Sequence, residues 1–257
     1  MRRTFPVNRL SDGRALLNLG SSARVAPGWN NVDSSWLLRL ARRPRLAALL
    51  HKVGLVSDYR YDRLRQLDRD VVCWDLRGGI PFADGTFDVV YHSHVLEHIR
   101  REAASAFLVE CRRVLRPGGI LRVVVPDLEQ LSRDYLEVVQ RLPDQARREE
   151  HAAAVDEIFD QMVTRVPRAR ATMPPLVRLL ETILVGDTAR SGEQHFWMYD
   201  RFSLSWLLQE CGFIDVNPAG PSSSRIAGWE GFRLDTEANG AVYKPGSLYV
   251  EAVRPDP

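Results

Sequence analysis

A glycine and two aspartates each follow a short apolar segment of the sequence, in an order typical of nucleotide-binding turns. These residues are Gly20, Asp33 and Asp75. A glycine allows an unusual backbone angle and a close approach to a ligand. The Asp33 carboxylate could accept hydrogen bonds from both hydroxyls of a ribose, and the Asp75 carboxylate could accept one from an adenine amino group. These residue types therefore predict a site for a nucleoside-like ligand.

The connection between Gly20 and Asp33 discriminates between two such ligands. A dinucleotide site needs a glycine-rich turn that runs into a helix, whose N-terminus receives the pyrophosphate. The segment 23–28, ARVAPG, offers little room for that helix. S-adenosylmethionine has no pyrophosphate, so the short connection favours this methyl donor over NAD.

Three further side chains are candidates for removing a proton from a hydroxyl acceptor, a step in which a general base helps. His94 borders the predicted crevice, and His195 lies in an aromatic-rich segment that could fold back over the acceptor. Asp127 is the carboxylate alternative. A hydrogen-bonded structural role is an equal alternative for His94, and packing among aromatic neighbours is the stronger alternative for His195. We expect the Glu97-His98 pair to begin the helix after the fourth strand, with a mainly structural role and contact with the ligand as the lesser alternative.

Alternating strand and helix patterns must position these residues. We expect strands at 15–19, 29–33, 71–74, 87–91 and 119–125, with a helix at 102–115 that ends at the turn 117–119. Such alternation predicts a parallel sheet with right-handed crossovers, and ligands of such sheets bind at the carboxyl ends of the strands. A helix at 203–211 and a hairpin of 213–216 with 247–253 complete the expected fold.

Two helical regions lie outside this pattern. Residues 128–190 show helical runs at 150–164 and 176–185, so we expect one domain, 1–257, with a helical insertion at about 128–200. Residues 36–54 form a basic amphipathic stretch with four arginines, one lysine and no acidic residue. Such a stretch can lie on an anionic membrane, but more often it is a surface helix that packs its leucines inward. A cap over the cofactor is a further interpretation.

The composition argues against some classes of binding partner. A net charge of +2 over 257 residues argues against a dedicated nucleic-acid binder. The three cysteines lie far apart, and no Cys/His cluster indicates zinc, so we expect no metal and reduced thiols in a cytoplasmic protein. The N-terminus lacks the apolar core of a signal peptide. The expected partner is a small-molecule acceptor, and the oligomeric state stays open.

Two long motifs carry a resemblance to a known family. DLRGGIPFADGTFDVVYHSHVLEHI and the later VLRPGGILRVVVPD resemble the class I S-adenosylmethionine-dependent methyltransferases. The opening LNLGSS and GWNNVD resemble a bacterial subgroup of that family that acts on small molecules such as sugars. The resemblance covers about residues 15–127 and continues more loosely through HFWMYDRFSLSWLLQECGF. It implies a Rossmann-like α/β fold with a seven-stranded, mostly parallel sheet whose last strand is antiparallel.

The resemblance also implies S-adenosylmethionine as cofactor and assigns roles to the strand ends. The turn at Gly20 would wrap the methionine part, Asp33 would hold the ribose, and Asp75 with Leu76 would bracket the adenine. The expected cofactor-binding set is Asn18, Gly20, Ser21, Ser22, Asp33, Asp75, Leu76, Ser93 and His94. Ser22 stands where the family motif has another glycine, which adds a side chain where backbone and ligand meet.

The expected function is therefore methyl transfer to a small molecule, by O-methylation of a sugar or secondary metabolite. Two alternatives remain open. The Ser22 departure motivates a non-catalytic module that keeps the fold without binding the donor. A methyltransferase that acts on a protein is the other alternative.

Overall fold

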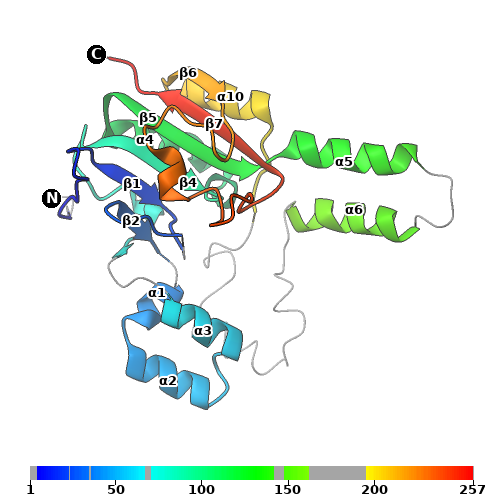
Figure 1. Ribbon diagram of the computed structural model, residues 1–257, viewed down its shortest axis with the longest axis horizontal. Helices are drawn as coiled ribbons and strands as arrows, with labels where there is room; N and C mark the ends of the chain where they lie inside the picture. Colours follow the sequence, from blue (N-terminus) through cyan, green and yellow to red (C-terminus); the bar gives the residue numbers. More distant parts are fainter. Residues whose placement is uncertain are drawn as a thin grey trace.

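A seven-stranded sheet forms the centre of the computed structural model, which describes residues 5–22, 24–34, 36–66, 71–141, 148–161 and 195–256 (Figure 1). The strand order is β3-β2-β1-β4-β5-β7-β6. The strands are β1 (Leu16–Leu19), β2 (Asn30–Asp33), β3 (Val72–Cys73), β4 (Phe87–Ser93), β5 (Leu115–Pro126), β6 (Ile214–Pro218) and β7 (Ser247–Val253). β1 to β5 pair in parallel, and β7 runs antiparallel to both β5 and β6. The predicted Rossmann-like fold with its antiparallel last strand is confirmed.

The order of the strands reverses between β1 and β4. The chain proceeds outward from β1 through β2 to β3 and then returns to pair β4 with β1. Leu19 is level with both Val32 and His92, and Asp33 is level with Cys73. The carboxyl ends of these four strands therefore lie along one edge, which is where open parallel sheets bind their ligands. We call it the carboxyl edge.

The sheet is buried because both of its faces are covered by apolar side chains. The helix α4 (Arg101–Val114) follows β4 and buries the stripe Ala104, Phe107, Leu108, Cys111 and Val114. Its spacing places these residues on one helical face. A second cluster on β1, β4 and β5 packs around Trp29 and Trp229. These two clusters fix the strands whose ends carry the candidate site.

Two expected boundaries differ from the structure. β5 begins at Leu115, directly after α4, so the turn 117–119 lies inside the strand. The reason is that Leu115 already pairs with Phe87, and the extra residues form an irregularity before Ile120 pairs with Val89. Glu97 and His98 do not begin a helix either, because they belong to a short 3₁₀ turn, η2 (Leu96–His98), ahead of α4.

The helix expected at 203–211 is α10 (Arg201–Glu210). Asp200 caps its first turn, and its carboxylate accepts hydrogen bonds from the backbone N–H groups of Phe202 and Ser203. Such a cap satisfies donors that have no partner within the helix. The expected hairpin of the last two strands is present as β6 and β7.

Several helices lie outside the sheet (Figure 1). α1 (Trp36–Ala41), α2 (Pro44–Lys52) and α3 (Asp58–Gln66) share a small apolar cluster of their own. α5 (Leu128–Gln140) and α6 (Arg148–Gln161) follow β5 and contact one another. The remaining short elements are η1 (Leu76–Gly78) and α11 (Trp229–Phe232). Within the described residues, none of the helices has the length and apolar character needed to cross a membrane.

The basic stretch 36–54 thus consists of α1 and α2, and Pro44 begins the second helix. Leu40 and Ala47 face inward in this small cluster, whereas Leu49 is 56% exposed. Within the expected insertion at 128–200, α5 and α6 are helical, whereas the described residues 195–200 are not. Its expected helical run 176–185 lies outside the described residues, and the bounds of the insertion remain predictions.

Candidate active site

The turn after β1 is held against the end of β2. The backbone N–H groups of Gly20 and Ser21 donate to the carbonyl oxygen of Val32 at 2.8 and 3.1 Å. The N–H of Ser22 donates to Oδ2 of Asp33 at 2.6 Å. Ser22 adopts a φ of 45°, a left-handed conformation in which a non-glycine residue is uncommon. The buried Asp33 carboxylate therefore holds the turn that the sequence assigns to the cofactor.

Gly20 is required here by two independent constraints. Its φ of +67° favours glycine. A Cβ at this position would also lie 2.3 Å from Cγ2 of Val95, the second residue after β4. The glycine thus lets the β1 turn approach the segment that follows β4, which brings the two halves of the candidate site together.

A small cavity of about 40 Å³ opens beside this turn. Five residues of the expected cofactor set contribute to its lining, namely Asn18, Gly20, Ser21, Ser22 and Ser93. Ser21 is 3% exposed, and its hydroxyl makes no hydrogen bond to any described residue. Buried hydroxyls normally have a partner, so this one fits a site that receives a polar group of a ligand.

Asn18 and Asp75 of the expected set already have partners within the chain. The Asn18 amide donates to the carbonyl oxygen of Arg24 at 2.8 Å and to Oδ1 of Asn31 at 3.0 Å. Asp75 caps η1, which contains Leu76, and pairs with Arg77 at 2.7 Å. This guanidinium lowers the pKa of Asp75. Asp75 lies at the expected edge, and its role toward adenine stays a prediction.

His94 connects the end of β4 to two other elements. It has a φ of +52°. Its Nε2 lies 2.9 Å from Oγ of Ser247 at the start of β7, and its Nδ1 lies 3.1 Å from Oε1 of Glu97. With both ring nitrogens engaged, the histidine is well placed to fix the orientation of Glu97, which accords with the structural alternative considered above.

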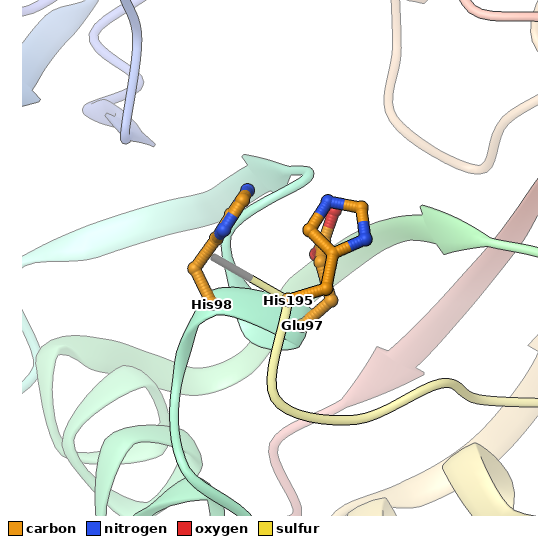
Figure 2. Close-up of side chains that lie close together, drawn as sticks. All are labelled: Glu97, His98 and His195. Carbon is orange, nitrogen blue, oxygen red and sulfur yellow. The ribbon is translucent and has the colours of Figure 1, made fainter. Parts of the chain in front are cut away.

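Glu97, His98 and His195 lie close together (Figure 2), and His94 contacts Glu97. Each of the first three offers a ligand atom, and these atoms all lie within 4.8 Å of one another. The rings of His98 and His195 are 4.7 Å apart at an angle of 72°. The N–H of Phe196 donates to the carbonyl oxygen of Glu97 at 2.7 Å, which fastens the chain beside His195 to η2. We call these three residues the Glu97 cluster.

The electrostatics of this cluster are unusual. Glu97 is fully buried, yet neither carboxylate oxygen accepts a well-formed hydrogen bond from a described residue. Burial by itself raises the pKa of Glu97, but the His94 and His98 imidazoles outweigh it and lower the pKa. The sequence analysis named His195 as a candidate base but did not connect it with Glu97 and His98. The spacing of His94, Glu97 and His98 was the available signal.

Asp127, the carboxylate alternative, is the N-cap of α5. Its Oδ1 accepts hydrogen bonds from the N–H groups of Glu129 and Gln130 at 2.9 and 3.3 Å. This capping gives Asp127 a structural role. Its proposed role as a base remains a prediction without a supporting contact among the described residues.

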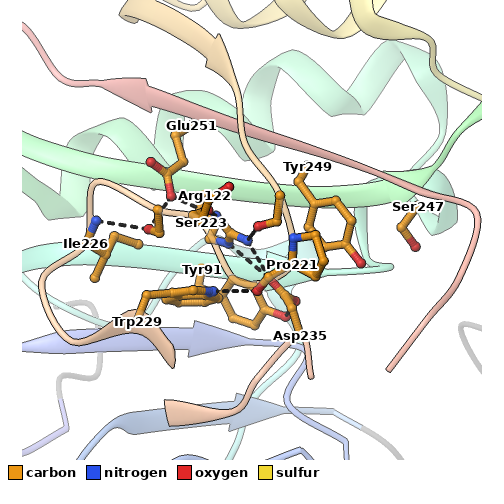
Figure 3. Close-up of polar contacts among 12 residues, drawn as sticks. Tyr91, Arg122, Pro221, Ser223, Ile226, Trp229, Asp235, Ser247, Tyr249 and Glu251 are labelled. Atoms are coloured by element: carbon orange, nitrogen blue, oxygen red, sulfur yellow. Dashed lines mark hydrogen bonds and ion pairs between the residues drawn. The ribbon is translucent and has the colours of Figure 1, made fainter. Parts of the chain in front are cut away.

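Arg122 forms a buried network of ion pairs that anchors the segment between β6 and β7 (Figure 3). Arg122 is fully buried and pairs with Asp235 and Glu251, both at 2.8 Å. The Tyr91 hydroxyl donates to Oδ1 of Asp235 at 2.5 Å. The guanidinium also lies 4.2 Å from the ring centre of Trp229. We call this the Arg122 network.

Three residues of the same segment line the cavity, Leu234, Tyr243 and Lys244. The guanidinium of Arg24 stacks 3.6 Å from the ring centre of Tyr243. Burial lowers the pKa of Lys244, and the carboxylates of Glu97 and Asp235 act in the opposite direction. The sequence analysis missed this lysine because the segment shows no periodic pattern.

Comparison with known proteins adds a family match. Residues 56–123, which run from just before α3 into β5, match the family described as "Methyltransferase domain". An uncharacterised 37.1 kDa protein in a transposon of Streptomyces fradiae is 43% identical over 56 residues, which is 22% of this chain and 16% of that protein. A Mycolicibacterium smegmatis protein named "Probable S-adenosylmethionine-dependent methyltransferase" is 42% identical over 57 residues, 21% of each chain. The match thus spans only a small part of each relative.

Solved structures show a weaker likeness. A Pyrococcus horikoshii protein gives a TM-score of 0.44 at 15% identity, with 95% of this chain and 82% of that chain covered. A Burkholderia thailandensis 1,6-didemethyltoxoflavin-N1-methyltransferase, solved with S-adenosylhomocysteine, gives 0.40 at 12% identity over 95% and 72%. These scores are too low to add to the assignment. The family match therefore concerns residues 56–123, less than half of the chain, and the observed strand order is that of a Rossmann-like fold.

Proposed function

We propose that the chain is an S-adenosylmethionine-dependent methyltransferase that methylates a hydroxyl group of a small molecule, such as a sugar or secondary metabolite. The observation that carries this proposal is a juxtaposition at the carboxyl edge. The cofactor turn at Gly20 packs directly against Val95, and the Glu97 cluster begins two residues further along the chain. The Gly20 turn, assigned to the methyl donor, thus lies next to the Glu97 cluster, whose polar side chains suit an acceptor.

The residues of the β1 turn fit the donor. The unpartnered Ser21 hydroxyl lines the cavity and offers a hydrogen bond to a polar ligand group. Asp33, buried at the end of β2, would hold the ribose, and Ser93 would face the cofactor from the end of β4. When bound, S-adenosylmethionine supplies an activated methyl group on its sulfonium.

The chain itself must orient the acceptor, exclude water and accept a proton. Alignment of the reacting groups is the main contribution that a protein can make to such a transfer. His195 lies on the segment held over η2 by the Phe196–Glu97 hydrogen bond, so it is placed to orient or deprotonate an acceptor hydroxyl. Lys244 adds a positive charge at the cavity that would favour an acceptor with a negative group.

A small, hydroxylated acceptor is favoured over a nucleic acid by the nearly balanced charge of +2. The free thiols of Cys73, Cys111 and Cys211 support a reducing compartment, and we assign the activity to the cytoplasm on that ground. A protein acceptor is the competing assignment, and the experiment below distinguishes it.

The test is methyl transfer itself. The purified chain is incubated with donor carrying a deuterated methyl group and with a panel of sugars, polyols, phenols and peptides, and products are read by mass spectrometry. We expect label on a small hydroxylated compound and release of S-adenosylhomocysteine. Label on peptides alone would contradict the acceptor class, and no binding of either cofactor form at millimolar concentration would favour a module without catalysis.

A matched pair of variants assigns the role of His195. His195→Ala should lower turnover more than donor affinity, because the residue is placed on the acceptor side. His51→Ala, which removes a histidine stacked on Tyr61 in the helical cluster α1–α3, should change neither. An equal loss of turnover and donor affinity in His195→Ala would argue against an acceptor-side role.

A further inference from the structure

The Glu97 cluster contains a buried charge that the described protein does not fully satisfy. Glu97 is 0% exposed, and both of its carboxylate oxygens lack a well-formed hydrogen bond among the described residues. The nearby Nδ1 of His94, at 3.1 Å, is an ion-pair neighbour at one oxygen only. A buried carboxylate is costly unless it is paired and hydrogen-bonded or coordinates a metal. The geometry around Glu97 is therefore that of an incomplete site.

Two imidazoles complete the donor set from different parts of the chain. His98 is adjacent to Glu97 in η2, and His195 comes from a segment nearly a hundred residues later, as Figure 2 shows. The hydrogen bond from Phe196 to the Glu97 carbonyl oxygen, at 2.7 Å, fixes this long-range approach through the backbone. A backbone contact next to a donor atom reduces the conformational freedom lost when a ligand binds.

His94 supplies the support that metal sites usually have around their ligands. Its Nε2 lies 2.9 Å from the Ser247 hydroxyl, and its Nδ1 faces the Glu97 carboxylate. Groups that hydrogen-bond to a ligating carboxylate orient it and are a regular part of metal sites. β7 thus contributes to the orientation of Glu97 through Ser247 and His94.

The donor chemistry selects a class of ion. Two imidazoles and one carboxylate suit zinc and the neighbouring divalent transition metals, whereas calcium and magnesium prefer oxygen donors alone. In a tetrahedral zinc site, ligand atoms about 2.0–2.2 Å from the metal lie roughly 3.3–3.6 Å from one another. The three donor atoms lie within 4.8 Å of one another, so binding of an ion requires them to move closer together.

We infer that Glu97, His98 and His195 bind one divalent transition-metal ion, with at least one coordination position left open for an oxygen of the acceptor. Three protein ligands leave such a position in a four-coordinate zinc site. With the ion bound, His195 orients the acceptor through the metal and does not act as its base. The ion-binding claim stands on the cluster alone. The assignment of the open position to an acceptor oxygen rests on the proposed function. It requires S-adenosylmethionine to occupy the Gly20 turn beside Val95 during the reaction.

The test uses Co²⁺ as probe, since its visible absorption reports its ligands. The full chain is freed of metal with chelator and titrated with CoCl₂, and Zn²⁺ is then added in competition, followed by calorimetry. We expect one equivalent of Co²⁺ with visible bands, displaced by Zn²⁺. His195→Ala and His98→Ala should each weaken the affinity at least about tenfold, the lower end of what even a supporting residue costs.

Two controls keep the result decisive. His51→Ala removes a histidine on α2 and should leave Co²⁺ binding unchanged. Glu97→Gln removes the charge at the centre of the cluster and should weaken binding by a similar or larger factor; if it does not fold, the two histidine variants decide alone. Failure of the wild type to bind Co²⁺ stoichiometrically, or unchanged binding in both histidine variants, would overturn the inference.

S-adenosylhomocysteine is titrated into the same samples, so that the two proposals fail separately. Cofactor binding without Co²⁺ binding would overturn the metal site and leave the methyltransferase assignment intact. Co²⁺ binding without cofactor binding would uphold the ion site and contradict the proposed function. A shift of the Co²⁺ bands on addition of the acceptor found by mass spectrometry supports the open position, and unchanged bands contradict that part.

Discussion

The Arg122 network and the Glu97 cluster are equally buried but differ in how fully their charges are satisfied. Arg122 forms ion pairs with Asp235 and Glu251, and Tyr91 donates to Asp235 as well. Glu97 has one ion-pair neighbour and no well-formed hydrogen bond among the described residues. Tyr91 of the Arg122 network lines the cavity beside the β1 turn, and the Glu97 cluster begins two residues after Val95, which contacts that turn.

The difference separates a structural role from a functional one. A fully satisfied buried network rigidifies and specifies one arrangement, whereas a partly satisfied one is costly and needs an explanation. The Arg122 network fixes the segment that delivers Tyr243 and Lys244 to the cavity. We assign the Glu97 cluster to ion binding, because its three ligand atoms lie within 4.8 Å of one another. The experiments below separate these two roles.

The largest effect is expected from breaking the Arg122 network. Arg122→Met leaves the buried Asp235 carboxylate without its cation and leaves Glu251 with the more distant Arg225, at 3.6 Å. We expect the free energy of unfolding to fall by about 3–5 kcal/mol, measured by urea denaturation. Adding Asp235→Asn and Glu251→Gln should recover part of the loss, because the stranded charges are removed. A loss under about 1 kcal/mol in Arg122→Met would contradict the structural role.

An effect of similar size on the free energy of unfolding is expected from His92, a buried residue of β4, when the pH is lowered. Its two ring nitrogens have no hydrogen-bond partner among the described residues, and its ring packs 5.2 Å from that of Phe107. Burial lowers the pKa of His92 from 6.5 to about 4, although the Glu97 charge raises it. The folded protein therefore keeps this ring neutral where the unfolded chain would protonate it.

Stability should consequently decrease as the pH falls from 6.5 toward 4. In this window the unfolded chain binds the extra proton, so the free energy of unfolding declines with acidification by about 3 kcal/mol in total. Urea denaturation at several pH values measures the slope. His92→Leu should be flatter across the same window, and identical slopes in the two proteins would remove His92 as the cause.

A smaller effect is expected at the donor turn. Asp33→Ala removes a buried acceptor that also holds the Ser22 N–H at 2.6 Å. Loss of such a partner costs about 1–3 kcal/mol, so S-adenosylhomocysteine should bind at least about tenfold more weakly by calorimetry. Asp84→Ala is the matched control, because that carboxylate is exposed and pairs with Arg113 away from the turn. Equal affinities in Asp33→Ala and wild type would exclude Asp33 from the site.

The smallest effect on stability is expected from Glu97→Gln in metal-free protein. The amide loses the ion-pair neighbour His94 but no longer buries a charge that lacks hydrogen bonds. We expect a change in the free energy of unfolding of less than about 1 kcal/mol, in contrast to Arg122→Met. A loss as large as that of Arg122→Met would place the cluster among the structural networks.

Much of the fold could be predicted from the sequence because its strands and α4 follow simple apolar periodicities. The boundary of β5 could not, because Leu115 pairs with Phe87 through a contact that no local pattern encodes. The η2 turn was mistaken for a helix start because its acidic and basic residues match the preference of a first turn. Sequence periodicity reports local structure, and these errors arose where tertiary pairing decided the outcome.

The candidate site likewise contains some residues that could be predicted from the sequence and others that could not. Gly20, Asp33 and Ser93 could be placed from their positions at strand ends, since parallel topology brings such ends together. Lys244 comes from a segment without periodicity, and its approach depends on the buried Arg122. The Glu97 cluster needs His195 from a distant part of the chain, and the fixing contact is a backbone hydrogen bond. Neither could be read from spacing alone.

The most direct test of the central claim is a crystal structure of the chain with S-adenosylhomocysteine. The expected result places the ribose hydroxyls within hydrogen-bonding distance of the Asp33 carboxylate, with the Ser21 hydroxyl bonded to the amino-acid part of the ligand. A ligand bound away from the carboxyl edge, with Asp33 and Ser21 untouched, would contradict the claim.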